Sequence, residues 1–171
     1  VHGSPDALGL GGQHVGMAEV LVDIAVAGGA SIELGDRVAV MCNGRIVQTD
    51  SPQVLYHHPV DRWTAEFVGT ISVLVGDARS GMAQCSLGSL AVAPQLHGPV
   101  EVVLRPEQLS LEPGGDATVQ LVEYYGHDTM IFVSLGDEQL RVRCGPAAPY
   151  VRGDHVRVTF TGEVASAFEI S

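Results

Sequence analysis

The chain has few basic residues for its size. Its 171 residues include nine Lys and Arg against twenty Asp and Glu, which gives a formal net charge of −11. Because an acidic surface repels phosphate backbones and anionic lipid headgroups, this balance argues against binding to nucleic acid or directly to a membrane surface. The only cysteines, Cys42, Cys85 and Cys144, match no zinc or disulfide framework. Their wide spacing favours a reduced, cytoplasmic setting and predicts no metal site.

Long apolar runs and targeting segments are also absent. No uninterrupted apolar stretch is long enough to span a bilayer, so we expect no membrane insertion. The opening VHGSPDALGLGG has no basic segment followed by an apolar one, which excludes a secretory signal there. Its first residue is Val, which fits a fragment, a processed chain or an unusual start codon. A hydrophobic content of 46% still predicts a globular protein with a core.

The most structured pattern lies between residues 36 and 69. Two β-prone runs flank Asn43-Gly44, which predicts a hairpin with a type I′ turn. Ser51 then precedes Pro52, a typical start for a capped helix that Pro59 would end. A second short helix is predicted from residue 62 to residue 68. Asp61 would cap its start and Gly69 would close its end.

After Gly69 the sequence alternates short β-prone runs with Gly, Pro and Asp turns. This spacing predicts an all-β barrel or sandwich. The predicted strands are Ser72–Val75, Met82–Ser86, Ser89–Val92, Val100–Arg105, Thr118–Tyr125, Met130–Leu135, Gln139–Cys144 and Val156–Phe160.

Taken together, these patterns resemble the C-terminal part of ATP-binding subunits of ABC importers. The hairpin, capped helix, proline stop and second helix are similar to the end of the ATPase domain in that family. Leu104-Arg105-Pro106-Glu107 and Arg152-Gly153-Asp154 resemble motifs of its C-terminal TOBE domain, an OB-like β domain. Within the family, the run EYYGHDTM favours iron and polyamine importers over sugar importers.

The resemblance extends weakly to the first residues. Leu10, Gly11, Gly12 and Gln13 resemble a degenerate ABC signature motif, with Leu10 where a serine hydroxyl would stand. In the family this loop and the following helix end bind the γ-phosphate of ATP, so Gly11, Gly12 and Gln13 are weak candidates for cofactor binding. The alternative is a plain Gly-rich turn. Val26 occupies the position of the family's switch histidine, at the end of a predicted strand from Val20.

Other parts of the ATPase machinery have no counterpart in the chain. There is no G-x-x-x-x-G-K-[ST] loop and no aliphatic run that ends in Asp-Glu. Phosphoryl transfer depends on positioned charge and metal, so the chain is expected to catalyse no ATP hydrolysis alone, to have no catalytic residues and to hold no ATP or Mg²⁺ of its own.

Four smaller patterns have competing interpretations. Arg105 and Glu107 are either a partner-binding ion pair or, as favoured here, a structural pair that orders a turn. His57 and His58 are adjacent on a helix, so surface exposure is favoured over metal binding. For the aromatic residues Tyr124, Tyr125 and Phe132, core packing is favoured over base stacking. Arg152-Gly153-Asp154 is read as a turn before a strand and not as an adhesion motif.

The predicted fold class is α+β: a truncated remnant of an ABC nucleotide-binding domain at residues 1–69, then an OB-like TOBE barrel at residues 70–171. By resemblance, the chain would supply the regulatory and dimerisation domain of a solute importer. Its partners would be membrane subunits and a second ATP-binding subunit, at the inner face of the cell membrane. The alternatives are a stand-alone ligand-sensing or dimerising TOBE module, and an ATPase that acquires its Walker motifs from a separate polypeptide.

Overall fold

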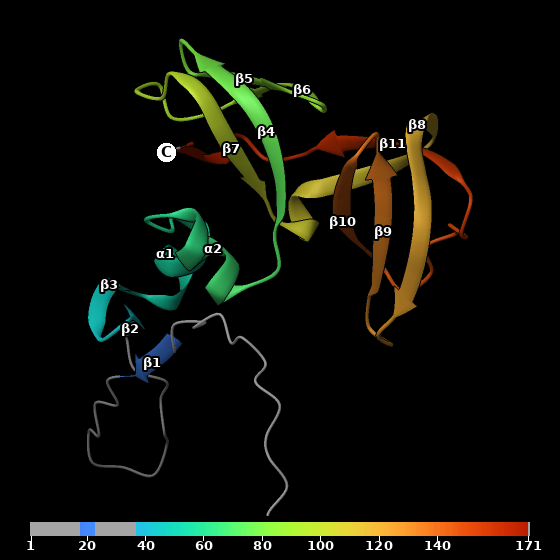
Figure 1. The fold of residues 1–171 in the computed structure, drawn as a ribbon. Coiled ribbons are helices and arrows are strands. Elements are labelled where there is room, and N and C mark those ends of the chain that lie inside the picture. Colours follow the sequence, from blue (N-terminus) through green and yellow to red (C-terminus); the bar gives the residue numbers. More distant parts are fainter. Residues whose placement is uncertain (1–17, 23–36, 171) are drawn as a thin grey trace, which may run out of the picture.

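The computed structural model describes residues 18–22, as backbone only, and residues 37–170. Its first sheet has three antiparallel strands in the order β1-β2-β3 (Figure 1): β1 Ala18–Val22, β2 Val38–Cys42 and β3 Arg45–Asp50. The turn between β2 and β3 has Asn43 at φ 50° and Gly44 at φ 72°. Both values are positive, so the predicted hairpin is confirmed. The described part of the predicted strand from Val20 pairs with β2, and Val26 lies outside the described residues.

Two short helices follow, and their start signals act as predicted. In α1, Pro52–His57, the Ser51 side chain accepts a hydrogen bond from the Val54 amide at 3.3 Å. In α2, Arg62–Val68, the Asp61 carboxylate accepts one from the Thr64 amide at 2.7 Å. Both bonds satisfy amides that have no partner inside the helix.

The end of α2 differs from the prediction. Gly69 has φ 170°, an extended conformation open to any residue and not the left-handed one of a glycine cap. Its lack of a side chain matters for packing instead. A Cβ atom at this position would lie 2.9 Å from Cε2 of Tyr56.

The second sheet has five strands in the order β12-β7-β4-β5-β6, all antiparallel neighbours. They are β4 Ser72–Arg79, β5 Met82–Cys85, β6 Gly88–Ala91, β7 Gly98–Leu104 and β12 Ser166–Glu169. β12 was not predicted, and it joins the edge of the sheet beside β7.

The third sheet has four strands in the order β10-β9-β8-β11. They are β8 Leu109–Tyr124, β9 Thr129–Leu135, β10 Glu138–Cys144 and β11 His155–Phe160, and a single 3₁₀ turn at Pro106–Gln108 leads into them from β7. β8 is twice as long as predicted. Its first half pairs with β11 and its second half with β9.

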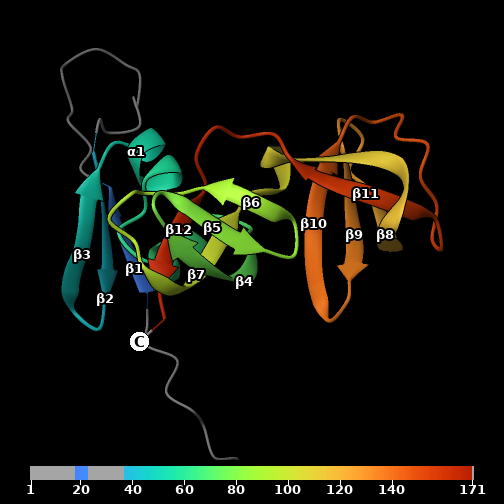
Figure 2. The same ribbon diagram turned by 90° about the horizontal axis from the view of Figure 1, so that it is seen from above.

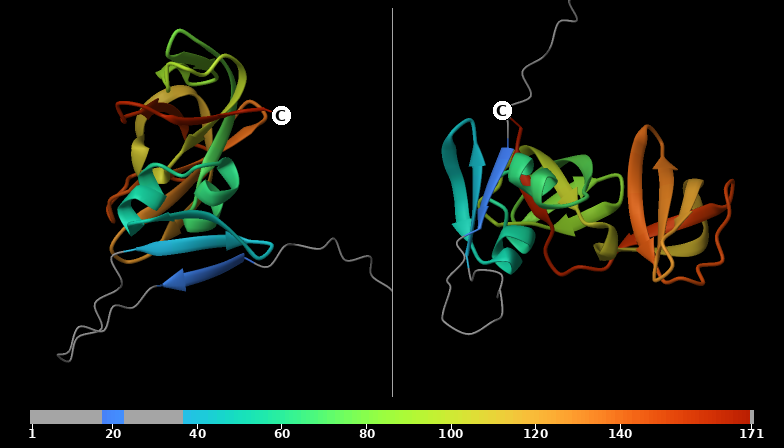
Figure 3. Two further views of the ribbon diagram at one scale, coloured as in Figure 1. Left: turned by 90° about the vertical axis from the view of Figure 1, so that its left-hand side faces the viewer. Right: turned by 90° about the horizontal axis from the view of Figure 1, so that it is seen from below.

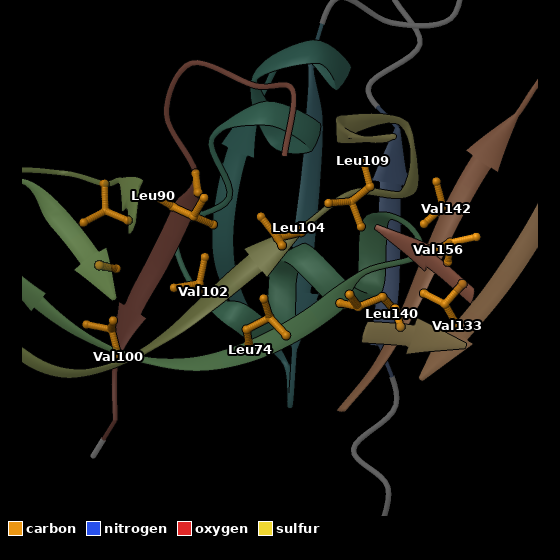
Figure 4. Close-up of a cluster of buried hydrophobic side chains, with 14 of the residues drawn as sticks. Leu74, Leu90, Val100, Val102, Leu104, Leu109, Val133, Leu140, Val142 and Val156 are labelled. Carbon is orange, nitrogen blue, oxygen red and sulfur yellow. The ribbon is translucent and has the colours of Figure 1, made fainter. Parts of the chain in front are cut away.

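The two larger sheets share one hydrophobic core (Figure 4). Leu74 and Leu104 from the five-stranded sheet and Ile131, Leu140 and Val156 from the four-stranded sheet are fully buried in it. This mostly β architecture agrees with the predicted OB-like fold, built here as two hydrogen-bonded sheets around one interior.

The helices lie between the three-stranded sheet and the five-stranded sheet, and the four-stranded sheet is at the far end (Figures 2 and 3). Ala65 of α2 packs with Ile71 and Val103 in a second, smaller apolar cluster. The predicted domain boundary at Gly69 stays a prediction. Within the described residues, no helix is long and apolar enough to cross a membrane.

Candidate functional site

The predicted cofactor residues Gly11, Gly12 and Gln13 lie outside the described residues. Their interpretation as a degenerate phosphate loop therefore stays a prediction. The clearest assembly of polar side chains in the described part of the chain is elsewhere, where β7 meets the ends of the two helices.

At this junction Arg105, directly after β7, is only 5% exposed. Its Nη1 donates to the carbonyl oxygens of Ala65 and Gly69 at 2.9 Å each, and to that of Thr70 at 3.3 Å. Its Nη2 donates to the carbonyl oxygen of Tyr56 at 3.1 Å. One guanidinium thus binds four carbonyl oxygens near the C-terminal ends of α1 and α2, where helices leave carbonyls without partners and where a positive charge is favoured.

The Tyr56 side chain completes the junction. The guanidinium carbon of Arg105 lies 4.1 Å from the centroid of the Tyr56 ring, a cation–π contact. The Tyr56 hydroxyl donates to Oε1 of Glu107 at 2.5 Å. Gly69 leaves the room for this arrangement, because a Cβ there would also lie 3.2 Å from Nη1 of Arg105. We call these four residues, Tyr56, Gly69, Arg105 and Glu107, the arginine clamp.

The electrostatics of the clamp follow from burial. Burial lowers the pKa of Arg105, against the opposing effects of Tyr56 and Glu107, yet a guanidinium stays charged. Burial and then the hydrogen bond to Glu107 raise the pKa of the Tyr56 hydroxyl, so the phenol stays protonated. The clamp therefore holds a buried cation on neutral carbonyl dipoles.

The predicted pairing of Arg105 with Glu107 is wrong. The described structure contains no direct ion pair between them: Arg105 turns inward to the helix carbonyls, and the exposed Glu107 accepts from Tyr56 instead. The physical reason is that buried carbonyls need donors more than an exposed carboxylate does. The clamp has no nucleophile or base aimed at a free space. Its chemistry is structural, and it ties the helices to the β domain.

The other predictions from the sequence have different outcomes. His57 and His58 are exposed, and no group of three or more metal-ligating side chains occurs in the part of the chain that the structure describes. Gly153, at φ 95°, lies in the predicted turn before β11. Core packing of Tyr124 and Tyr125 is wrong: they are 67% and 56% exposed, because β8 ends there.

Sequence reasoning marked Arg105 but missed the other half of the clamp. Tyr56 and Gly69 carry no local signal for it, since they lie 49 and 36 residues from Arg105 in the chain. The only sequence signal for the clamp was the Arg-Pro-Glu run, which places a cation between a buried strand and a tight turn.

Comparison with known protein families gives one match, to part of the chain. The TOBE domain family matches residues 102–168, from β7 to β12, a range that contains Arg105 and Glu107.

Several curated proteins match a longer stretch. Two Fe(3+) ions import ATP-binding proteins of Rhodococcus jostii (strain RHA1) are 36% and 37% identical over 146 and 150 residues. These matches cover 80% and 82% of this chain, and 42% and 43% of those proteins. A spermidine/putrescine import ATP-binding protein of Ruegeria pomeroyi is 34% identical over 152 residues, 79% of this chain and 42% of its own length. The chain thus spans less than half the length of these relatives.

Proposed function

We propose that the chain supplies the regulatory and dimerisation part of an ATP-binding subunit of an ABC importer, because the TOBE domain family matches residues 102–168 and the relatives are named import ATP-binding proteins. The observation that carries this proposal is the span of the TOBE match. It runs from within β7 to within β12, covers all four strands of the four-stranded sheet, and includes Arg105, the residue through which the β domain holds the helices. A regulatory domain needs a firm attachment to the part it regulates, and the clamp provides one.

We further propose that these 171 residues do not bind or hydrolyse ATP alone. The proposal rests on the sequence, which has neither a phosphate-binding G-x-x-x-x-G-K-[ST] loop nor an aliphatic run ending in Asp-Glu. Without them, nothing positions the β- and γ-phosphates or a magnesium ion. If a nucleotide is bound outside these 171 residues, its binding would gain only a weak contribution from Gly11, Gly12 and Gln13.

The names of the relatives suggest the transported solute. Ferric iron and the polyamines spermidine and putrescine appear in them, and we propose a solute of one of these two groups. The working partners would be the importer's membrane subunits and a second ATP-binding subunit. The complex would sit at the cytoplasmic face of the cell membrane.

Two measurements on the purified chain test the proposal. In a calorimetric titration, Mg-ATP added to millimolar concentration should give no binding heat. Micromolar binding would refute the loss of the nucleotide site. Sedimentation at increasing protein concentration should show a dimer forming, whereas a monomer at every concentration would refute the dimerisation role. Restored hydrolysis on mixing with a separate Walker-containing polypeptide would instead favour the two-chain ATPase.

A further inference from the structure

A cleft of about 360 Å³ lies beside an irregular stretch of β8. Along β11 the partner residue in β8 jumps from Thr118, opposite His155, to Pro113, opposite Val156. Residues 114–117 are therefore extra residues of a β-bulge, a feature that often re-aims side chains next to binding sites. We call the space that they border the bulge cleft.

The bulge depends on its two glycines. Gly114 and Gly115 have φ 79° and 134°, values that residues with side chains rarely adopt. A Cβ on Gly115 would lie 2.7 Å from the carbonyl oxygen of Val156 and 2.8 Å from the backbone nitrogen of Arg157. The backbone of the bulge thus lies directly against β11, and Asp116 of the bulge and Arg157 of β11 both line the cleft.

The cleft combines an apolar floor with a charged rim. Ala117 and Val156 are buried in the core below it, and Leu87, Leu135 and Val158 pack against that core. Ser86, Asp116, Arg157 and Thr159 supply its polar groups. Its volume lies within the range of about 300–1,000 Å³ that small-molecule sites occupy.

The two charges on the rim have no side-chain partner among residues 37–170. Neither Asp116 nor Arg157 takes part in any side-chain hydrogen bond or ion pair of the described structure. Glu112 faces Arg157 across the strands, and it too forms no ion pair with it. By contrast, Arg62, Arg79 and Arg143 each bind a carboxylate. An opposite pair of unused charges above an apolar floor suits a ligand that carries both signs and an apolar group.

We propose that the bulge cleft binds a small zwitterion with an apolar side chain, of the chemical class of the aliphatic and aromatic α-amino acids. Arg157 binds the carboxylate, for which a guanidinium offers parallel N–H donors. Asp116 binds the ammonium group, and the apolar floor of the cleft takes the side chain. This site is independent of the clamp and of the proposed transporter role.

The test is an NMR titration of the ¹⁵N-labelled full chain with L-leucine to millimolar concentration. Amide shifts should concentrate in residues 115–117 and 156–159 and saturate. Two analogues test recognition of both charges: 4-methylpentanoate lacks the amine, and 3-methylbutylamine lacks the carboxylate. Each should bind roughly tenfold more weakly than L-leucine, because each loses one charge-assisted hydrogen bond.

Matched variants complete the design. Arg157→Gln and Asp116→Asn should each weaken L-leucine binding roughly tenfold. Arg152→Gln and Asp137→Asn remove exposed charges of the same kind outside the cleft, and they should leave binding unchanged. The proposal is overturned if L-leucine causes no saturable shifts, if the shifts lie away from the cleft, if either analogue binds as well as L-leucine, or if the two cleft variants bind it like the wild type. None of these outcomes involves ATP or dimer formation, so they do not bear on the proposed function.

Discussion

Replacing Arg105 by Met should separate the stability of the helices from that of the β domain. The substitution keeps an unbranched apolar stem and removes all four hydrogen bonds that the guanidinium donates. The carbonyl of Ala65 accepts in a fully buried position and would lose its partner, at a cost of about 1–3 kcal/mol. The other three carbonyls are partly exposed, so water can replace much of what they lose. The expected total is about 3 kcal/mol.

The chain contains its own probe for this experiment. Its one tryptophan, Trp63, lies in α2 and stacks on Phe67 with ring centroids 5.2 Å apart. Urea unfolding followed by Trp63 fluorescence therefore reports the helices, and far-ultraviolet circular dichroism reports mainly the strands. In the wild type the two transitions should coincide. In Arg105→Met the Trp63 midpoint should fall by about 1.5 M, for a slope near 2 kcal/mol per M, and precede the loss of strand signal.

Two further variants make the result specific. Arg105→Lys should show an intermediate loss, because an ammonium group reaches some of the carbonyls but lacks the planar fork that spans both helices. Arg62→Met removes an exposed ion pair between α2 and Glu101 and should cost under about 1 kcal/mol. The reasoning is refuted if Arg105→Met unfolds in one coincident transition with a midpoint no lower than that of Arg62→Met.

Three other substitutions test neighbouring contacts by urea unfolding. Gly69→Ala should lower the free energy of unfolding by about 1–3 kcal/mol because the added methyl group crowds Tyr56, and by less in a Tyr56→Ala background. An equal loss in both backgrounds would contradict the packing argument. Tyr56→Phe loses the bond to Glu107 and should cost about 1 kcal/mol at neutral pH. Because the pKa of Tyr56 is raised, the stabilisation by its hydroxyl is complete below about pH 10 and is lost as the pH rises through the folded-state pKa. The urea midpoint of Tyr56→Phe should therefore fall less at alkaline pH than that of the wild type. An equal fall would argue against this effect. Asp61→Ala should cost about 1 kcal/mol through the lost cap of α2, and no change would show that the cap contributes nothing.

The sequence was most informative where structure depends on near neighbours. Asn43-Gly44 fixes a hairpin because its two residues accept positive φ, and Ser51 and Asp61 cap helices through amides three residues away. In these cases the residues that decide the conformation are within one turn of each other. Prediction of the existence and type of the element then succeeds.

It was least informative where distant segments meet. The first half of β8 was missed because Pro113, Gly114 and Gly115 are typical of a loop, although β8 pairs with β11 on both sides of the two glycines. β12 was missed because four residues with one aromatic give little pattern, and its pairing with β7 decides it. The role of Arg105 was misassigned for the same reason: a nearby carboxylate was visible in the sequence, and the helix carbonyls were not.

The order of strands in the two large sheets has a consequence for synthesis of the chain. β4 to β7 belong to the five-stranded sheet, β8 to β11 build the other sheet, and only then does β12 return to complete the first beside β7. During translation, the β12-facing edge of β7 therefore stays unpaired until some sixty further residues have left the ribosome. An unpaired β edge invites association with other chains, and long-range closure of this kind is slow. The four-stranded sheet is in effect inserted into the five-stranded one, so the two should fold as one cooperative unit.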